Sequence, residues 1–245
     1  SRRCYEAMNP ATDDITEAQT LLSADGLHIA ARSALPALSI NLTLGLGELH
    51  LVQTRHKEHS TDIADGLLGL GETGGDRVRY LGTAWSGLTL REAFARRRGV
   101  GRIRSRGHWM ETRSVMENVL LPSLHHTILP EDHLRESASA LALRFGLPGL
   151  PVGLPDECTT ADLERAACVQ AFLGRPTLVI LEHPMEFEDS SLLAPMMNAI
   201  QQVRRRGGSV IWFTEHAAHL ADASIPASRR YRLVGAQLLD LEFRQ

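Results

Sequence analysis

Apolar and polar positions alternate in short runs over residues 21–51, and turn-forming residues interrupt the runs. The interrupting residues are Gly26, Pro36, Gly45 and Gly47. Alternation with a period of two, broken by glycine or proline, is typical of antiparallel strands. We therefore expect an antiparallel sheet in this region, preceded by a polar, flexible arm over residues 1–20.

Two continuously apolar runs lie nearer the C-terminus, TLVIL at 177–181 and SVIWFT at 209–214. A helix-like segment that ends at two glycines separates them. Strands of a parallel sheet are covered on both faces, so their sequences are apolar throughout rather than alternating. The pattern predicts a strand–helix–strand unit with two parallel, buried strands.

The central part of the chain has helical periodicity. Residues 61–70 predict a helix and residues 76–81 a strand. Further along, apolar side chains recur on one helical face, at Leu134, Ala138, Leu141 and Phe145. We expect an α/β domain over residues 21–245 in which a helical lobe, at about 85–170, is inserted into the core.

Composition restricts the class of protein further. The chain has 245 residues, 43% hydrophobic side chains and a formal net charge of -3, which gives no general attraction to nucleic acid. It has no apolar run of 18 residues, so any membrane role is expected to be peripheral. Its three cysteines lack the spacing of a zinc site, which favours a reducing compartment such as the cytoplasm.

Arginine is concentrated in one segment, with eight arginines between Arg91 and Arg113. Such a run usually forms a solvated face. The alternative is a surface that meets lipid headgroups or an acidic partner loop, formed by Arg96, Arg97, Arg98, Arg102 and Arg104.

Several segments together resemble the ATP-binding subunit of ABC transporters over about residues 21–239. GELHLV, HSTDIADGLLGL and DRVRYLG are similar to the strand, phosphate loop, helix and strand that open that domain. ADLERAACVQAFLGRPTLVILEHP is similar to the signature helix running into the Walker B strand, and SVIWFTEHAAHLAD to the H-loop strand. The resemblance implies a P-loop NTPase fold of the ABC type. Within the family, SVMENVLLPSLHHTILPEDHL most resembles the ATPases of MCE or Mla-type phospholipid transporters.

The phosphate loop implied by this resemblance lacks its usual residues. Such a loop needs glycines whose N–H groups surround the phosphates, a lysine, and a Ser/Thr hydroxyl for Mg²⁺. In QTRHKEHST the glycine positions hold Gln53, His56 and Glu58, and the lysine position holds His59. Ser60 and Thr61 retain their hydroxyls.

The other motifs of the family are also changed. Glu182 stands where the Mg²⁺-associated aspartate is expected, and His183 where the glutamate that polarises water is expected. Ser105 replaces the Q-loop glutamine, and Glu215, followed by His216, replaces the H-loop histidine. In the signature segment CTTAD, Thr159 keeps a hydroxyl where the family has serine, and Asp189 matches the D-loop aspartate.

These departures favour an ABC-type subunit that has lost catalysis, with no cofactor or only weak binding of ATP and Mg²⁺. It is expected to dock on a transmembrane permease around residues 105–118, at the inner face of the cell membrane. Its second partner is expected to be another copy of itself or a different ATP-binding subunit. In a heterodimer, the site that uses Thr159 of this chain would be the more active one.

Two alternatives remain open at this point. In one, the chain is an active ATPase in which His59 supplies positive charge and His183 or His216 acts in catalysis. In the other, the fold brings Glu58, His59, Glu182, His183, Glu215 and His216 together as a metal-binding regulatory site. Turnover that falls on His183→Ala would test the first, and a zinc titration of the melting temperature the second.

Overall fold

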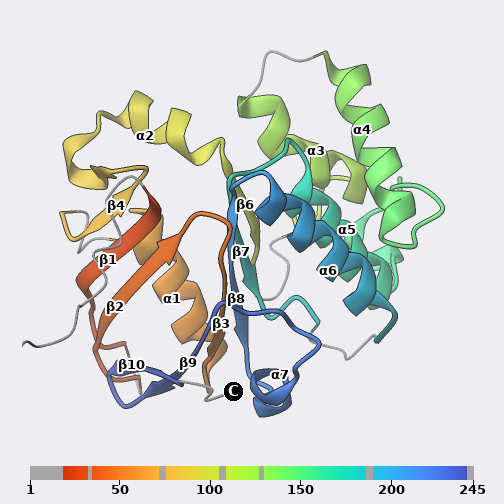
Figure 1. Ribbon diagram of the computed structural model, residues 1–245. Coiled ribbons are helices and arrows are strands. Elements are labelled where there is room, and N and C mark those ends of the chain that lie inside the picture. Colours follow the sequence, from red (N-terminus) through yellow and green to blue (C-terminus); the bar gives the residue numbers. More distant parts are fainter. Residues whose placement is uncertain are drawn as a thin grey trace, which may run out of the picture.

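A computed structural model describes residues 19–32, 35–71, 76–104, 109–126, 130–185 and 190–241. They form a six-stranded sheet, a smaller four-stranded sheet and a group of helices (Figure 1). The predicted arm at 1–20 lies outside the described residues except for its last two, and the first strand already begins at Thr20.

The smaller sheet is antiparallel, with the strand order β2-β1-β4-β5. Its strands are β1 (Thr20–Ile29), β2 (Leu38–Gly45), β4 (Val78–Tyr80) and β5 (Thr83–Ala84). Buried and exposed residues alternate along β2, as the sequence predicted for this region. Residues 49–53 behave differently: this segment is buried on both faces, so it joins the larger sheet as a parallel strand.

The larger sheet has the order β10-β9-β3-β8-β7-β6. Its strands are β3 (Leu49–Gln53), β6 (Val100–Ile103), β7 (Leu178–Glu182), β8 (Ser209–Thr214), β9 (Arg229–Val234) and β10 (Gln237–Asp240). All neighbouring pairs are parallel except β9 and β10. Every residue of β7 and β8 is buried, as expected from their continuously apolar sequences.

Two hydrophobic clusters cover the two faces of the larger sheet. On one face, α1 (Lys57–Leu67) packs between the two sheets through Ile63, Ala64 and Leu67. On the other, α3 (Val115–His126), α4 (Glu131–Arg144), α5 (Thr160–Phe172) and α6 (Ser190–Arg205) form a helical layer, seen on the right of Figure 1. Leu134, Ala138 and Phe145 of the predicted apolar face are buried in this second cluster, and Leu141 packs against it.

The helical layer does not coincide with the predicted insertion at about 85–170. That range also contains a short 3₁₀ turn (Trp85–Gly87), the surface helix α2 (Leu90–Arg97) and strand β6 of the larger sheet. Helix α1 also differs from expectation, because it begins at Lys57 rather than at Thr61. No glycine or proline interrupts residues 53–65, so the helical backbone extends to the end of the preceding turn.

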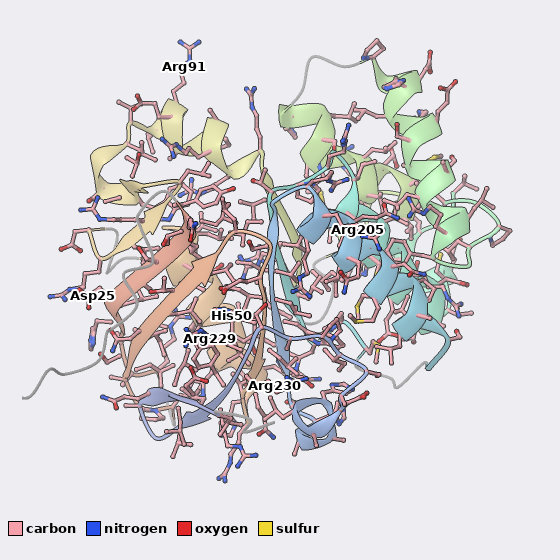
Figure 2. The ribbon with its side chains drawn as sticks, viewed as in Figure 1. Asp25, His50, Arg91, Arg205, Arg229 and Arg230 are labelled. Atoms are coloured by element: carbon pink, nitrogen blue, oxygen red, sulfur yellow. The ribbon has the colours of Figure 1, made fainter. Side chains whose placement is uncertain are left out.

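Two short elements remain among the described residues. They are a second 3₁₀ turn (Pro155–Glu157) and the short helix α7 (Ala217–Ala221). Figure 2 shows His50 within the body of the protein, whereas Arg91 projects away from α2. Among the described residues, no helix combines the length and apolar character needed to cross a bilayer.

Candidate functional site

The candidate site lies where three parallel strands of the larger sheet end. Thr54 follows β3 and leads into α1, His183 follows β7, and Glu215 follows β8. Carboxyl ends of parallel strands meet at one edge of a sheet, which is where open α/β sheets usually bind ligands. The backbone N–H of Thr54 donates to the carbonyl of Thr214 at 3.0 Å, so the segments after β3 and β8 are held together.

Only the second part of the segment expected to form a phosphate loop is helical, because residues 54–56 connect β3 to α1 and the helix begins at Lys57. His56 is the N-cap residue, and its side chain caps none of the helix N–H groups that the structure describes. The N–H of His59 donates to the carbonyl of His56 at 3.2 Å. Glu58 is exposed in this first turn. The connection between β3 and α1 is therefore short and contains no glycine, and Glu58 and His59 belong to the first turn of the helix.

His59 does not supply the positive charge of the missing lysine. Its residue is only 5% exposed, and within the described part of the chain neither ring nitrogen has a hydrogen-bond partner. Burial lowers the pKa of the His59 imidazole, and the nearby His56 lowers that pKa further. The ring is therefore neutral at pH 7, which removes the basis for a cationic role in an atypical ATPase.

Ser60 is fully buried, and its hydroxyl is surrounded by partners. Its Oγ lies 2.6 Å from Nε2 of His183 and 3.2 Å from Oγ1 of Thr54, and it donates to the carbonyl of Lys57 at 3.0 Å. A serine hydroxyl has one hydrogen and two lone pairs. These three contacts therefore saturate the group that would otherwise serve a Mg²⁺ ion.

His183 is held in place by its backbone as well as its ring. It has a φ of 50°, in the left-handed region that is uncommon for residues other than glycine. Its N–H donates to the carbonyl of Phe213 at 3.0 Å, and its ring turns toward Ser60. The hydrogen bond to Ser60 occupies Nε2, one of the two nitrogens that a catalytic base would offer.

Glu182 is the centre of a buried polar network that joins three elements. Its Oε2 accepts a hydrogen bond from Oγ1 of Thr61 at 2.6 Å, and its Oε1 accepts one from Nε of Arg102, also at 2.6 Å. Nη1 of Arg102 in turn donates to Oδ1 of Asp65 at 2.5 Å. The Glu182 side chain is 0% exposed. The carboxylate predicted to associate with Mg²⁺ is therefore neutralised by an arginine of the same chain.

The role of Arg102 was not predicted from the sequence. The density of arginines in this segment suggested a single exposed surface. Arg96 donates to the carbonyl of Tyr80 at 2.9 Å, and Arg97 donates to the carbonyl of Leu68 at 3.0 Å while covering the Trp85 ring. Three members of the predicted surface, Arg96, Arg97 and Arg102, thus bind groups inside the domain. The hypothesis that all five face lipid headgroups is wrong.

The segment after β8 borders a small cavity of about 200 Å³. Lys57, His183, Glu215 and His216 contribute to its wall together with Pro184, Met185, Trp212, Thr214 and His219. The His216 ring lies 5.3 Å from that of His219, whose Nδ1 is 2.8 Å from Oγ1 of Thr214.

The predicted metal site is not assembled. Among the described residues, no three His, Cys, Asp or Glu side chains are arranged so that they could hold one metal ion. Glu58 is exposed, His59 is buried without a partner in that part of the chain, and Glu182 is bound by Arg102. The side chains that were expected to share one metal ion therefore make separate contacts instead: Glu182 binds Arg102, and His183 binds Ser60.

The remaining predicted site residues lie apart from this network or outside the described residues. Thr159 is the N-cap of α5: its Oγ1 accepts from the N–H of Asp162 at 3.1 Å and donates to the Asp162 carboxylate at 2.8 Å. It lines neither cavity described here. Ser105 and Asp189 lie outside the described residues.

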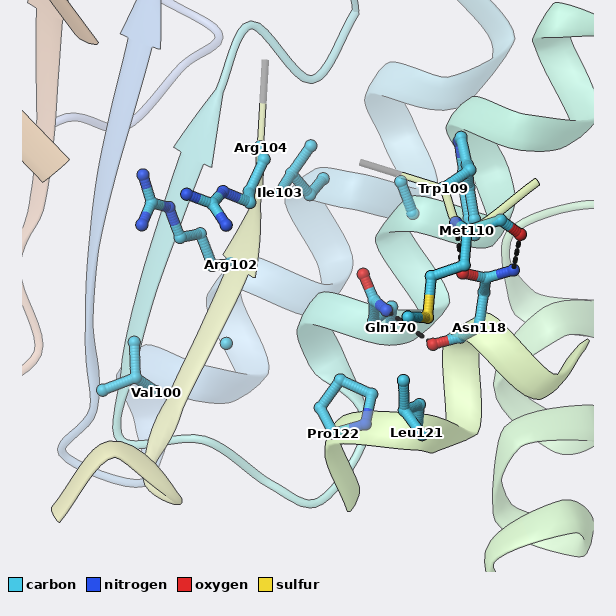
Figure 3. Close-up of a pocket in the computed structure, with 12 residues that line it drawn as sticks. Val100, Arg102, Ile103, Arg104, Trp109, Met110, Asn118, Leu121, Pro122 and Gln170 are labelled. Atoms are coloured by element: carbon cyan, nitrogen blue, oxygen red, sulfur yellow. Dashed lines mark hydrogen bonds between the residues drawn. The ribbon is translucent and has the colours of Figure 1, made fainter. Parts of the chain in front are cut away.

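A larger cavity of about 400 Å³ lies between β6 and the helices α3 and α5 (Figure 3). Asn118 organises one side, because its side chain accepts from the N–H of Met110 at 2.8 Å and donates to the Met110 carbonyl at 3.1 Å. Gln170 donates to the Asn118 carbonyl at 2.8 Å. Apolar groups from Ile103, Trp109, Met110, Leu121 and Pro122 line much of the remaining wall.

Comparison with known proteins agrees with this architecture. No protein-family model matches the chain. The chain is 29% identical to ATP-binding protein LolD 2 of the lipoprotein-releasing system of Rhodospirillum rubrum, over 92% of this chain and 96% of that protein. It is 26% identical to the phospholipid-transport protein MlaF of Haemophilus influenzae, over 47% of this chain and 44% of the relative.

Solved structures give the same fold. The dimeric structure of a bacterial ABC transporter cassette matches with a TM-score of 0.77 and 16% identity, over 91% of this chain and 99% of the other. An ATP-binding subunit of an ABC transporter matches with a TM-score of 0.73 and 19% identity, over 89% and 88% of the two chains. The fold expected from the resemblance is therefore confirmed.

Proposed function

We propose that this chain, a homologue of ABC transporter ATP-binding subunits with the fold of an ABC cassette, serves a membrane transport complex without hydrolysing ATP. It would lie at the cytoplasmic face of the membrane, bound to a transmembrane permease. The names of its relatives, a lipoprotein-releasing protein and a phospholipid-transport protein, favour a lipid or a lipid-linked protein as cargo.

The observation that carries this proposal is the bond between Arg102 and Glu182. Mg²⁺ requires oxygen ligands in octahedral geometry and usually takes one or two of them from carboxylates. Here the candidate carboxylate is buried and bound by a guanidinium, and the two hydroxyls of Ser60 and Thr61 are bonded to His183 and Glu182. The residues present do not fit a Mg²⁺–ATP complex.

The start of α1 adds a second obstacle to nucleotide binding. Glu58 stands in the first helical turn, where phosphates would approach, and His59 beside it is neutral. Two like charges at about 4 Å repel by about 1 to 4 kcal/mol at effective dielectric constants of roughly 80 to 20. This repulsion would remove up to about half of the roughly 8 kcal/mol that corresponds to a micromolar affinity.

The alternative of an active but atypical ATPase has less support. It requires His183 to act on a water molecule, yet Nε2 of His183 is bonded to a buried serine. It also requires a cation near the phosphates, and the His59 ring is neutral at pH 7. Turnover by the isolated chain that is lost on His183→Ala would nevertheless restore this alternative.

The cavity beside β6 supports docking on a permease. It combines an apolar wall with Arg104 and Asn118, and it lies between the larger sheet and the helical layer (Figure 3). A helix that presents apolar side chains and an acidic residue would match this lining. In the resembled family, the corresponding groove receives a cytoplasmic coupling helix of the permease.

Pairing with a second cassette is part of the proposal. ABC sites form between two subunits, and a homodimer of this chain would contain two altered sites. A heterodimer with a competent relative would contain one altered site and one that combines the partner's phosphate loop with Thr159 of this chain. We therefore favour a competent ATP-binding subunit as the partner.

Fractionation of the cells from which the protein comes tests the docking step. Leu121→Arg places a charge in the cavity wall and is expected to release the chain from the membrane fraction into the soluble fraction. Leu143→Arg is the matched control, because Leu143 is exposed on α4 and away from the cavity. Equal retention of both variants on the membrane would contradict docking through this cavity.

Nucleotide chemistry is tested separately by phosphate release from the purified chain, with an active ABC ATPase assayed beside it. We expect no release above background. Release that saturates with ATP and is lost on His183→Ala would refute the non-hydrolysing role.

A further inference from the structure

Arg102 reaches the strand-end network because of its position on β6. Successive side chains of a strand point to opposite faces of a sheet. Ile103 belongs to the cluster on the side of the helical layer, whereas Val100 packs against the cluster that contains α1. Arg102 shares the face of Val100, so its side chain extends toward α1. Only 11% of the side chain is exposed.

The arginine holds two carboxylates from different elements with two different nitrogens. Nε binds Glu182 at the end of β7, and Nη1 binds Asp65 on α1. A second cation, Arg104, lies 3.6 Å from the same carboxylate of Asp65. The four side chains comprise two acids and two bases, so the group is electrically balanced without any added ion.

We propose that Arg102 takes the place of Mg²⁺ in this cassette, as a cation built into the chain. It neutralises the carboxylate at the end of β7 and ties that strand to α1. In an ABC cassette that binds Mg²⁺–ATP, the ligand itself supplies this link between Walker B strand and phosphate loop. In this chain Arg102 links β7 to α1 without any ligand, so the end of β7 and the helix are held in one relative position.

Lysine would not perform this role. An ammonium group is a single point charge, whereas the planar guanidinium presents donors in several directions and can bridge two carboxylates. In this network Nε and Nη1 serve two different residues at 2.6 and 2.5 Å. The proposal therefore predicts that Arg102→Lys restores little of the stability lost in Arg102→Ala.

The inference deepens the proposed function, because the same carboxylate would be needed to hold Mg²⁺ with ATP. Its test is thermal unfolding of the purified chain, which uses no nucleotide. Arg102→Ala removes the cation that neutralises the buried Glu182 carboxylate, and we expect it to lower the melting temperature by about 6 to 20 °C. Arg104→Ala is the matched control, since its ion pair is longer and more exposed, and it should change the melting temperature little.

The double variant Arg102→Ala/Glu182→Gln separates charge pairing from simple loss of packing. Removing the carboxylate together with the arginine should recover at least half of the lost melting temperature. Millimolar Mg²⁺ should leave the unaltered chain unchanged and raise the melting temperature of Arg102→Ala, because a vacated cation position becomes available.

Three results would overturn the inference. They are equal melting temperatures for Arg102→Ala and Arg104→Ala, no recovery in the double variant, or stabilisation of the unaltered chain by Mg²⁺ alone. If Arg102→Ala is insoluble, a soluble double variant supports the inference, and an insoluble double variant beside soluble Glu182→Gln overturns it. Saturable phosphate release from ATP by the unaltered chain would instead refute the proposed function, whatever the melting temperatures of these variants.

Discussion

The middle of the parallel sheet and the ends of its strands differ sharply in chemistry. Along β7 and β8, every residue is buried, and nearly all are apolar until the last position. At the strand ends, Ser60, Glu182 and His183 are buried too, yet each is polar and bonded to another side chain. The same sheet thus contributes to a hydrophobic core along its strands and, at the strand ends, to a network of polar side chains that bond to one another.

This difference follows from what each kind of buried group requires. Apolar strand positions are stabilised by close packing and need no polar partner. A buried polar group is tolerated only when it has a partner, and a ligand is one possible partner. In this chain, the partners of the buried polar groups at the strand ends are other side chains of the same chain.

The largest effect is expected in the framework, at the contact between β6 and α5. A side chain at Gly101 would place its Cβ only 1.8 Å from the carbonyl oxygen of Ala171. Gly101→Ala should therefore force backbone movement and lower the free energy of unfolding by about 3 kcal/mol or more. Urea unfolding measures this change. Gly87→Ala is the control, because nothing lies within 4 Å of its added Cβ, and a similar loss in both variants would contradict the packing argument.

A smaller effect is expected at the edge of the network. Asp65→Asn keeps the shape of the side chain but removes the charge that Nη1 of Arg102 contacts. Hydrogen bonds to charged groups typically contribute about 1.5 to 3 kcal/mol, and partial exposure of Asp65 places the expected loss near 1 to 2 kcal/mol. Asp240→Asn disrupts a more exposed pair with Arg229 and should cost less in the same urea titration. The reverse order would show that the network adds no stability.

Thr159 has two interpretations: it caps helix α5 in the structure, and the sequence placed it in the signature segment. Its contribution to stability tests the first. As the N-cap of α5, it should contribute about 1 kcal/mol, so Thr159→Ala destabilises the chain and Thr159→Ser does not. Thr160→Ala, one residue later and exposed, provides the control for the loss of a threonine methyl and hydroxyl. Unfolding free energies that are identical for both alanine variants would exclude the capping role.

The smallest expected effect is the contribution of His59 to the pH dependence of the free energy of unfolding. Burial keeps the pKa of the folded-state imidazole below its ordinary value of 6.5, so near and below that pH the unfolded chain binds more protons than the folded one. Stability contributed by the neutral ring is therefore complete above about pH 6.5 and falls as the pH decreases through that value toward the folded-state pKa. His59→Gln should flatten the loss of stability between about pH 7 and pH 5.

His133→Gln, an exposed change on α4, should leave that pH profile unchanged. Denaturant midpoints measured across the pH range compare the two variants. If His59→Gln unfolds with the same pH dependence as the unaltered chain, the buried ring does not titrate as described.

Much of the architecture was accessible from the sequence because it depends on local pattern. The apolar runs at 177–181 and 209–214 identified parallel strands, and Leu134, Ala138 and Phe145 identified the buried face of a helix. Strand β3 was assigned to the wrong sheet, since its partners β8 and β9 lie far along the chain. Pairing between distant segments is set by the tertiary structure rather than by the pattern of one segment.

The site was only partly predictable for the same reason. The resemblance to ABC ATP-binding subunits drew attention to Ser60, Thr61, Glu182 and His183, but not to their bonds with one another. Arg102 lies 80 residues before Glu182 in a segment whose many arginines suggested solvent exposure. One available signal was an arginine on the inward-facing side of a short apolar strand, VGRI, where a buried counter-charge would be required.

The account rests most directly on whether the chain binds Mg²⁺–ATP. Titration calorimetry of the purified protein, with an active ABC ATPase as the positive control, measures this without assuming any partner. We predict no saturable heat up to millimolar ATP, because the carboxylate and hydroxyls that would hold the metal are bound within the chain. Saturable binding at micromolar ATP, with or without phosphate release, would contradict the account.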